Sequence, residues 1–130
     1  EYEAWLDSLA NEQTKKGGCN MLKVNQDGSI ELTRGDSACL VVPIVFEESN
    51  TEYEIQPGDV IKLSLKKSKY DDEILMQKVV TGSNVIHIQP SDTKKLDFTK
   101  YKYDVELTTE AGEVYTVIPY NTFKIAAEVT

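Results

Sequence analysis

The sequence predicts an all-β fold: an immunoglobulin-like antiparallel sandwich of about seven to nine strands, with a short helical tail at the N-terminus. Apolar and polar residues alternate in many short runs, which places one set of side chains on a core face and the other in water. Turn-forming pairs that contain glycine separate these runs. With 130 residues, 40% of them hydrophobic, the chain can bury one core and is too short for two.

Residues 1–16 have a helical rather than an alternating pattern. Their apolar side chains are spaced to share one helical face: Trp5, Leu6, Leu9 and Ala10. The pair Gly17–Gly18 ends this pattern. We therefore expect an N-terminal extension over residues 1–20, outside the core function, and the sandwich over residues 21–130. The codons that precede Met21 can contain a bacterial ribosome-binding site, which leaves open whether Met21 is the natural start.

Alternation continues beyond this extension and predicts the strands in order. The alternating runs are Ile30–Leu32, Leu40–Phe46, Ile61–Leu65, Ile86–Ile88, Tyr101–Leu107, Tyr115–Val117 and Phe123–Ala127. The turns between them are predicted at Asp27–Gly28, Gly35–Asp36, Pro57–Gly58, Gly82–Ser83 and Ala111–Gly112. The segment Asp71–Gln77 is ambiguous between helix and strand, and we interpret it as a turn that leads into a strand.

The segment Pro90–Leu96 interrupts the alternation and has the composition of a single helical turn, with a Ser-Asp pair suited to capping. Tyr101 follows Leu96 by five residues and begins a long alternating run. This is the layout of a tyrosine corner, in which the Tyr hydroxyl bonds upstream backbone near the start of strand F. Tyr103 then occupies the position that a cysteine has in antibody domains. Cys39 is therefore expected to be buried and unpaired.

The charge balance disfavours some classes of partner. The chain has 14 Lys and Arg against 22 Asp and Glu, and the net charge of -8 disfavours nucleic acid as a ligand. We expect no membrane insertion, because no apolar run approaches the roughly 20 residues that span a bilayer. Two cysteines, Cys19 and Cys39, are too few for the disulfide framework of a small secreted domain, which favours folding in the cytoplasm.

Two short motifs suggest ligands that their context does not support. Arg34–Ser37 is the integrin-recognition tetrapeptide, but we interpret it as a β-turn in which Gly35 accepts positive φ and Asp36 or Ser37 caps the turn. Asn25–Ile30 resembles the middle of a calcium-binding loop. The first and twelfth positions of such a loop need carboxylates and hold cations here, so we expect a hairpin turn and no metal site.

The sequence offers no recognisable catalytic set, so we predict a protein that is not an enzyme and needs no cofactor. His87 is the only histidine, and it is predicted to face solvent because it alternates with Ile86 and Ile88. A zinc site needs three or four His and Cys ligands, and only three such residues exist in the chain.

The seven tyrosines of the chain suggest a binding surface rather than a catalytic site. Tyr53, Tyr70 and Tyr120 fall in or beside predicted loops, where exposed rings suit sugar stacking or protein interfaces. Loop tyrosines are also commonly half-buried, so this role competes with simple packing. These three are the candidate binding residues. Four further residues are predicted to be structural: Leu96, Tyr101, Gly35 and Asp36.

Several segments share features with one family of viral proteins. They are Ile30–Ser37, a Pro-Gly-Asp element that leads into a strand at Gln56–Lys67, and the closing strands Tyr101–Leu107, Gly112–Pro119 and Phe123–Ile125. Together they resemble the N-terminal domains of phage baseplate and tail-fibre proteins, in particular the baseplate upper protein family. The resemblance implies a structural role, in which the domain anchors or decorates a tail assembly through contacts with itself, as a homo-oligomer, or with other tail proteins.

We therefore expect a non-enzymatic structural or assembly module of a phage or prophage tail or baseplate, folded in the bacterial cytoplasm and carried in the virion. The alternative is a bacterial surface or carbohydrate-binding Ig-like module, with a glycan as its ligand. Self-assembly, or an exposed edge strand that pairs with another chain, would favour the first hypothesis. A concave aromatic patch would favour the second.

Overall fold

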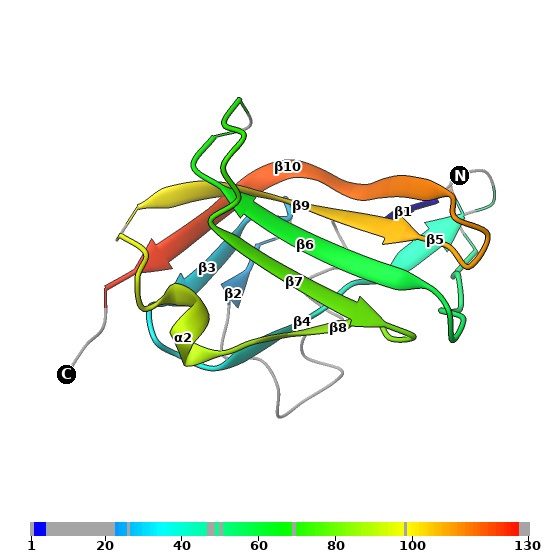
Figure 1. The fold of residues 1–130 in the computed structure, drawn as a ribbon, viewed down its shortest axis with the longest axis horizontal. Helices are drawn as coiled ribbons and strands as arrows, with labels where there is room; N and C mark the ends of the chain where they lie inside the picture. The colour runs from blue at the N-terminus through cyan, green and yellow to red at the C-terminus, as the bar shows by residue number, and fades with distance from the viewer. Residues whose placement is uncertain are drawn as a thin grey trace.

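The computed structural model describes residues 2–4, 23–25, 27–46, 49, 51–68, 70–97 and 99–127. These residues are almost entirely in strands and turns, as predicted, with one short helix (Figure 1). In chain order the elements are β1 (Tyr2–Ala4), β2 (Lys23–Val24), β3 (Ile30–Thr33), β4 (Ala38–Val41), β5 (Ile44–Phe46), β6 (Val60–Lys66), β7 (Met76–Thr81), β8 (Val85–Ile88), α2 (Pro90–Thr93), β9 (Lys100–Thr108) and β10 (Val114–Ala126).

The strands form one large sheet and two small ones. The six-stranded sheet has the order β2-β3-β10-β9-β6-β7, and the two-stranded sheets pair β4 with β8 and β1 with β5. β10 pairs with β3 in parallel, and with β9 in antiparallel orientation. The β4–β8 pair corresponds to strands B and E of an immunoglobulin-like sandwich, and β6, β9 and β10 correspond to strands C, F and G of the facing sheet. The fold is therefore the predicted Ig-like sandwich.

Alternation along the strands builds the core between the sheets. In β9 the inward side chains are buried, while the side chains between them remain partly exposed. The rings of Tyr103 and Phe123 meet edge to face, with centroids 5.8 Å apart. The Tyr103 hydroxyl donates to the Gly28 carbonyl, and burial raises the pKa of this hydroxyl well above its usual range. Tyr103 thus occupies the position that a cysteine has in antibody domains. Its ring packs in the core and its hydroxyl is hydrogen-bonded.

Two predicted elements near the N-terminus differ in the structure. Tyr2–Ala4, at the start of the predicted helical tail, form strand β1 and pair with β5. The predicted helical face from Trp5 to Ala10 lies outside the described residues. The run predicted as one strand over Leu40–Phe46 is divided into β4 and β5. Pro43 lies between the two strands. Because proline has no amide hydrogen to donate, it interrupts the ladder of backbone hydrogen bonds there.

The C-terminal half follows the predicted order with one change. Two predicted runs join into one strand of 13 residues, β10. Its register with β9 shifts between Thr116 and Ile118 and again between Ile118 and Asn121, and each shift adds an unpaired residue to β10. These bulges interrupt the alternation, which explains why the pattern indicated two strands. The ambiguous segment Asp71–Gln77 is a turn that leads into β7, as predicted.

Candidate protein-binding face

The six-stranded sheet turns one face to the core and the other to solvent, and we call the second the outer face. Because side chains alternate along each strand, the pairing register shows which residues are neighbours there. Lys66 lies opposite Lys102, and Lys100 lies opposite Lys124. The second row continues through Glu31 of β3 to Lys23 of β2. We call these five lysines, each exposed or half-buried, the lysine patch.

The charge of the lysine patch is offset only in part by the residues that the structure describes around it. The Lys124 ammonium lies 3.8 Å from a carboxylate oxygen of Glu31. Lys102 donates instead to a threonine hydroxyl of β10 at 3.1 Å. Lys66 lies 3.4 Å from the Tyr120 hydroxyl and 5.9 Å from the centroid of its ring, a cation–π distance. Two acids adjoin the five lysines, Glu31 and, toward the other end of the outer face, Asp104, so the patch keeps a net positive charge that is partly offset.

The opposite end of the outer face is electrically balanced. There the Lys62 ammonium lies 3.4 Å from a carboxylate oxygen of Glu106. Gln77 donates to the Ser64 hydroxyl at 3.2 Å, and the side chain of Val79 is exposed. The outer face is therefore divided into a balanced end and a lysine-rich end.

Asp104 lies between these two ends, opposite Ser64. Partial burial raises the pKa of the Asp104 carboxyl, and the neighbouring Glu106 carboxylate adds to this effect. Lys66 and Lys62 act in the opposite direction. Because the net shift is upwards, the two lysines do not fully offset the desolvation of this carboxylate.

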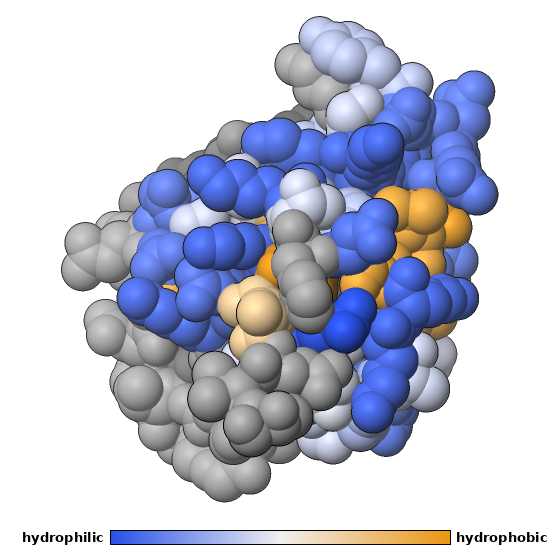
Figure 2. Space-filling view, turned by 90° about the vertical axis from the view of Figure 1, so that its left-hand side faces the viewer, coloured by the Kyte–Doolittle hydropathy of each residue, from blue (hydrophilic) through white to orange (hydrophobic). Residues whose placement is uncertain are grey.

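The loop between β6 and β7 projects from the end of the domain that carries the lysine patch (Figure 1). It turns at Ser68, whose carbonyl accepts from the Asp71 amide at 3.2 Å, and it closes where the Leu75 amide donates to the Leu65 carbonyl at 2.8 Å. Figure 2 views this end and shows a mostly hydrophilic surface with a hydrophobic patch at the right and a smaller, paler apolar area near the centre. The loop carries three consecutive exposed acids: Asp71, Asp72 and Glu73.

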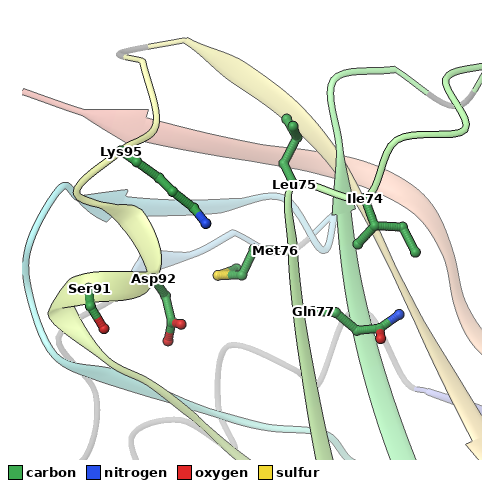
Figure 3. A pocket seen from close by; sticks show the side chains of 7 residues that line it. All are labelled: Ile74, Leu75, Met76, Gln77, Ser91, Asp92 and Lys95. Carbon is green, nitrogen blue, oxygen red and sulfur yellow. The ribbon is translucent and has the colours of Figure 1, made fainter.

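A groove of about 420 Å³ lies between α2 and the start of β7 (Figure 3). Ile74 and Met76 line its apolar side, and polar residues of the α2 segment line the other. Lys78 of β7 belongs to the inward-facing set of its strand and forms an ion pair with Asp92 of α2, 2.9 Å between the charged atoms. An inward-pointing charge on an edge strand opposes pairing with another chain. This arrangement therefore disfavours β-augmentation along β7.

The structure does not bring the three candidate tyrosines together. Tyr53 packs against the core and its hydroxyl donates to the Asp59 carboxylate, so its role is structural. Tyr120 contacts Lys66 at the opposite end of β6, about 20 Å from Asp59 by strand rise. Tyr70 is 83% exposed and lies in the projecting loop. One platform built from all three rings is therefore absent from the described surface.

Asp59 is a buried carboxylate that ties several turns at the balanced end of the sandwich. It accepts hydrogen bonds from the Gln56 amide at 2.9 Å, from the Glu110 amide at 3.2 Å and from the Tyr53 hydroxyl. Its main-chain carbonyl accepts from the Gly82 amide at 2.8 Å. The sequence pattern indicates a turn here but not this role, because two of the four partners are more than 20 residues away.

The predicted tyrosine corner is confirmed. The Tyr101 hydroxyl accepts from the Asp97 amide at 2.9 Å and donates to the Asp97 carbonyl at 3.2 Å. Leu96 is buried beside it, as expected for a structural residue. The helical turn α2 is also confirmed, but its N-cap is Gln89 rather than the Ser-Asp pair. Asp92 contributes from the third helical position, where its carboxylate accepts from the Gln89 amide at 2.7 Å.

The turn predicted at Gly35 and Asp36 is confirmed as structural. Gly35 has a φ of 87°, and the Asp36 amide closes the turn with a hydrogen bond of 3.2 Å. The Gly35 amide donates to Thr93 Oγ1 at 2.8 Å, and the Arg34 guanidinium donates to the Leu96 carbonyl at 3.3 Å. The integrin-like tetrapeptide is therefore fastened to the α2 segment instead of protruding as a ligand loop.

The calcium-like segment Asn25–Ile30 contains the predicted hairpin turn. The Asp27 carboxylate accepts from the Ser29 hydroxyl at 2.6 Å and from its amide at 2.9 Å, which lowers the pKa of Asp27. His87 is exposed on β8, as predicted. In the described part of the chain, no group of three or more His, Cys, Asp or Glu could hold a metal ion. No helix there is long and apolar enough to cross a membrane.

Cys39 corrects one prediction. Its side chain is buried, as expected, but it is disulfide-bonded rather than unpaired. The chain has one other cysteine, Cys19, which lies outside the described residues. The prediction considered only a partner across the sandwich, where Tyr103 takes the cysteine position, and it therefore missed this bond.

The lysine patch is the surface that sequence reasoning missed. The lysines between Lys62 and Lys69 are close in sequence and are followed directly by acids, so they indicated a mixed face. The patch instead collects lysines from four strands, β2, β6, β9 and β10. The alternation of Lys100 and Lys102 with buried tyrosines was the available signal, because it places both lysines on the outer face.

Comparisons with known proteins identify no family and give only a weak structural likeness. No family model and no curated protein matches the chain. Among solved structures, the chain is similar to murine CRIg, with 10% sequence identity and a TM-score of 0.38, over 78% of this chain and 92% of that chain. A likeness this weak carries no argument about function. The Ig-like assignment rests on the strand order and the tyrosine corner, and the candidate site rests on the outer face and its projecting loop.

Proposed function

We propose that this chain is a non-enzymatic structural or assembly module of a phage or prophage tail or baseplate, and that it acts through protein–protein contacts. The observation that supports this most directly is the outer face, whose lysine-rich end lies beside the projecting acidic loop. Side chains of opposite charge on one exposed surface suit recognition of a partner of matching pattern.

The size of the outer face agrees with this role. Six strands of 2 to 13 residues, spaced about 4.8 Å apart and about 20 Å long on average, give a planar area on the order of 500 Å². A standard protein interface buries about 800 Å² on each partner. The outer face and the adjacent loop together approach this area, so a contact that uses both is large enough to be specific.

The tail or baseplate context is supported by the sequence resemblance. Segments that resemble baseplate domains build β6, β9 and β10, three neighbouring strands of the six-stranded sheet. The resemblance therefore concerns the sheet that carries the candidate face.

The test is to purify tail particles from an induced culture of the source bacterium and to search them for the chain by mass spectrometry. We expect the chain in the particles. We expect the triple variant Lys100→Glu, Lys102→Glu, Lys124→Glu to fold but to be lost from them. The control changes charge of the same sign away from both the outer face and the loop, at two exposed lysines of the α2 segment, Lys94→Glu and Lys95→Glu. Particles that lack the wild-type chain would contradict the proposal.

The disulfide at Cys39 favours a second candidate, a bacterial surface or carbohydrate-binding Ig-like module. Disulfides persist mainly outside the reducing cytosol, so this bond suits an exported domain. The exposed ring of Tyr70 offers an aromatic contact for a sugar. A glycan array tests this candidate: binding that is lost in Tyr70→Ala or in Tyr120→Ala would support it. Arrays without a bound glycan would count against it.

A further inference from the structure

The lysine patch is an arrangement that the isolated domain does not favour. Lys66 and Lys102 are directly opposed across β6 and β9, and Lys100 and Lys124 are directly opposed across β9 and β10. Like charges in opposed positions of a sheet repel each other and destabilise it. The chain as a whole is acidic, with a net charge of -8, so the patch is a local exception. An unfavourable cluster of this kind suits a surface that an anionic partner neutralises.

The same chain carries a matching anionic element in the second half of the loop after β6, whose first half contains Lys67 and Lys69. The loop after β6 presents Asp71, Asp72 and Glu73 in succession, all exposed, and Ile74 adds an apolar side chain that is 46% exposed. The hydrogen bond from the Leu75 amide to the Leu65 carbonyl closes the base of the loop, and the Asp71 amide donates to the Ser68 carbonyl within it. The loop projects from the body of the domain (Figure 1). Among the described residues, none of the three acids forms an ion pair with a lysine of the same copy.

The loop and the patch lie at the same end of the molecule, because Lys66 is the last residue of β6 and the loop follows it directly. The two features have opposite charges, yet they do not neutralise each other within the described part of one copy. Two copies can satisfy both at once, since each offers a loop to the other's patch. Individual exposed ion pairs contribute little, but several in one cluster give a weak, salt-sensitive contact.

We propose that the acidic loop of one copy docks on the lysine patch of a second copy of this chain. This inference rests on the proposed function, because it names a partner for the same face. The contact joins Asp71, Asp72 and Glu73 to the lysines of β2, β6, β9 and β10, and it covers Ile74 at the rim. It does not use the β7 edge, where the ion pair of Lys78 opposes strand pairing.

Sedimentation equilibrium of the purified full chain tests the proposal at low salt, about 50 mM, and at high salt, about 0.5 M. We expect a mass above that of the monomer at low salt and at least about tenfold weaker association at high salt. One variant reverses the loop by Asp71→Lys, Asp72→Lys and Glu73→Lys. The other reverses the patch by Lys100→Glu, Lys102→Glu and Lys124→Glu. Each variant alone is expected to be monomeric, because loop and patch then carry the same sign.

The decisive experiment mixes the two variants in equal amounts. The basic loop of the first then faces the acidic patch of the second, and the acidic loop of the second faces the unaltered patch of the first. We therefore expect association to return in the mixture. A matched control, Glu52→Lys with Glu54→Lys and Glu113→Lys, makes the same charge change at exposed acids outside the loop and is expected to associate like wild type.

A wild type that is monomeric at low salt and high concentration would overturn the self-docking. Association that survives both reversals, or a mixture that stays monomeric while both variants show the circular dichroism of the wild type, would overturn it equally. The proposed function fails by a different result, the absence of the chain from purified particles. The two failures are therefore distinguishable.

Discussion

The two ends of the sandwich use the same residue types in opposite ways. At the balanced end, Asp59 is 1% exposed and accepts three hydrogen bonds, one of them from Tyr53. At the lysine-rich end, Asp71 and Tyr70 are exposed in the projecting loop. A buried carboxylate stabilises a fold only when donors surround it, whereas an exposed one keeps its charge available for a partner. Burial and nearby donors, rather than residue type, therefore separate the end that Asp59 stabilises from the end that carries the candidate binding surface.

The largest expected effect comes from removing the carboxylate at the structural end. Asp59→Ala leaves the Gln56 and Glu110 amides and the Tyr53 hydroxyl without their acceptor, so we expect a loss of about 3 kcal/mol in the free energy of unfolding. Urea denaturation measures this loss. The control Asp71→Ala removes an exposed carboxylate and should change stability by less than about 0.5 kcal/mol. Similar losses of stability in the two variants would contradict the contrast between the buried Asp59 and the exposed Asp71.

A smaller loss of stability is expected at the tyrosine corner. The corner is a structural element at the lysine-rich end of the sandwich. Tyr101→Phe removes the hydroxyl that accepts from and donates to Asp97, so we expect a loss of about 1 kcal/mol. Tyr120→Phe is the matched control, because its hydroxyl lies near an exposed lysine; we expect a change below about 0.5 kcal/mol. Thermal unfolding of both variants measures the difference. Equal destabilisation would show that Tyr120 is as structural as Tyr101.

The smallest effect concerns Asp104, which lies between the two ends. Its pKa is raised in the folded state, so the stability that its protonated form contributes is present at acidic pH and lost as the pH rises through the folded pKa. We therefore expect Asp104→Asn to be slightly more stable than wild type at about pH 7, by less than about 1 kcal/mol because solvent screens this half-exposed group. This advantage should disappear near pH 3. Thermal unfolding at both pH values checks the sign, and a variant that is less stable at neutral pH would contradict it.

Much of the fold could be predicted because its signals are local. Period-two alternation identified the buried faces of β6 and β9, and the turn at Gly35 followed from the positive φ that glycine accepts. The tyrosine corner was predictable because the Tyr101 hydroxyl bonds the backbone of Asp97, which is only four residues upstream. Breaks in a strand were harder to predict, since the bulges of β10 depend on its partner β9.

The candidate site could be predicted only in part. Tyr53 and Tyr70 were both candidate binding residues. The ring of Tyr70 is exposed, whereas the hydroxyl of Tyr53 bonds the buried carboxylate of Asp59. The disulfide at Cys39 was missed because the pattern of antibody domains was the only pairing considered. Each of these outcomes depends on which segments meet in space.

The sequence by itself determined an all-β Ig-like sandwich with its turns and corner, because alternation and turn preferences act between residues a few positions apart. Only the tertiary structure decided where charge accumulates. Lys23, Lys66, Lys100 and Lys124 are separated by tens of residues, and the strand register places them together on one face. The register also sets that face beside the acidic loop. Charges that neighbour one another across strands leave no local pattern in the chain, which is why the candidate binding surface could be identified only from the fold.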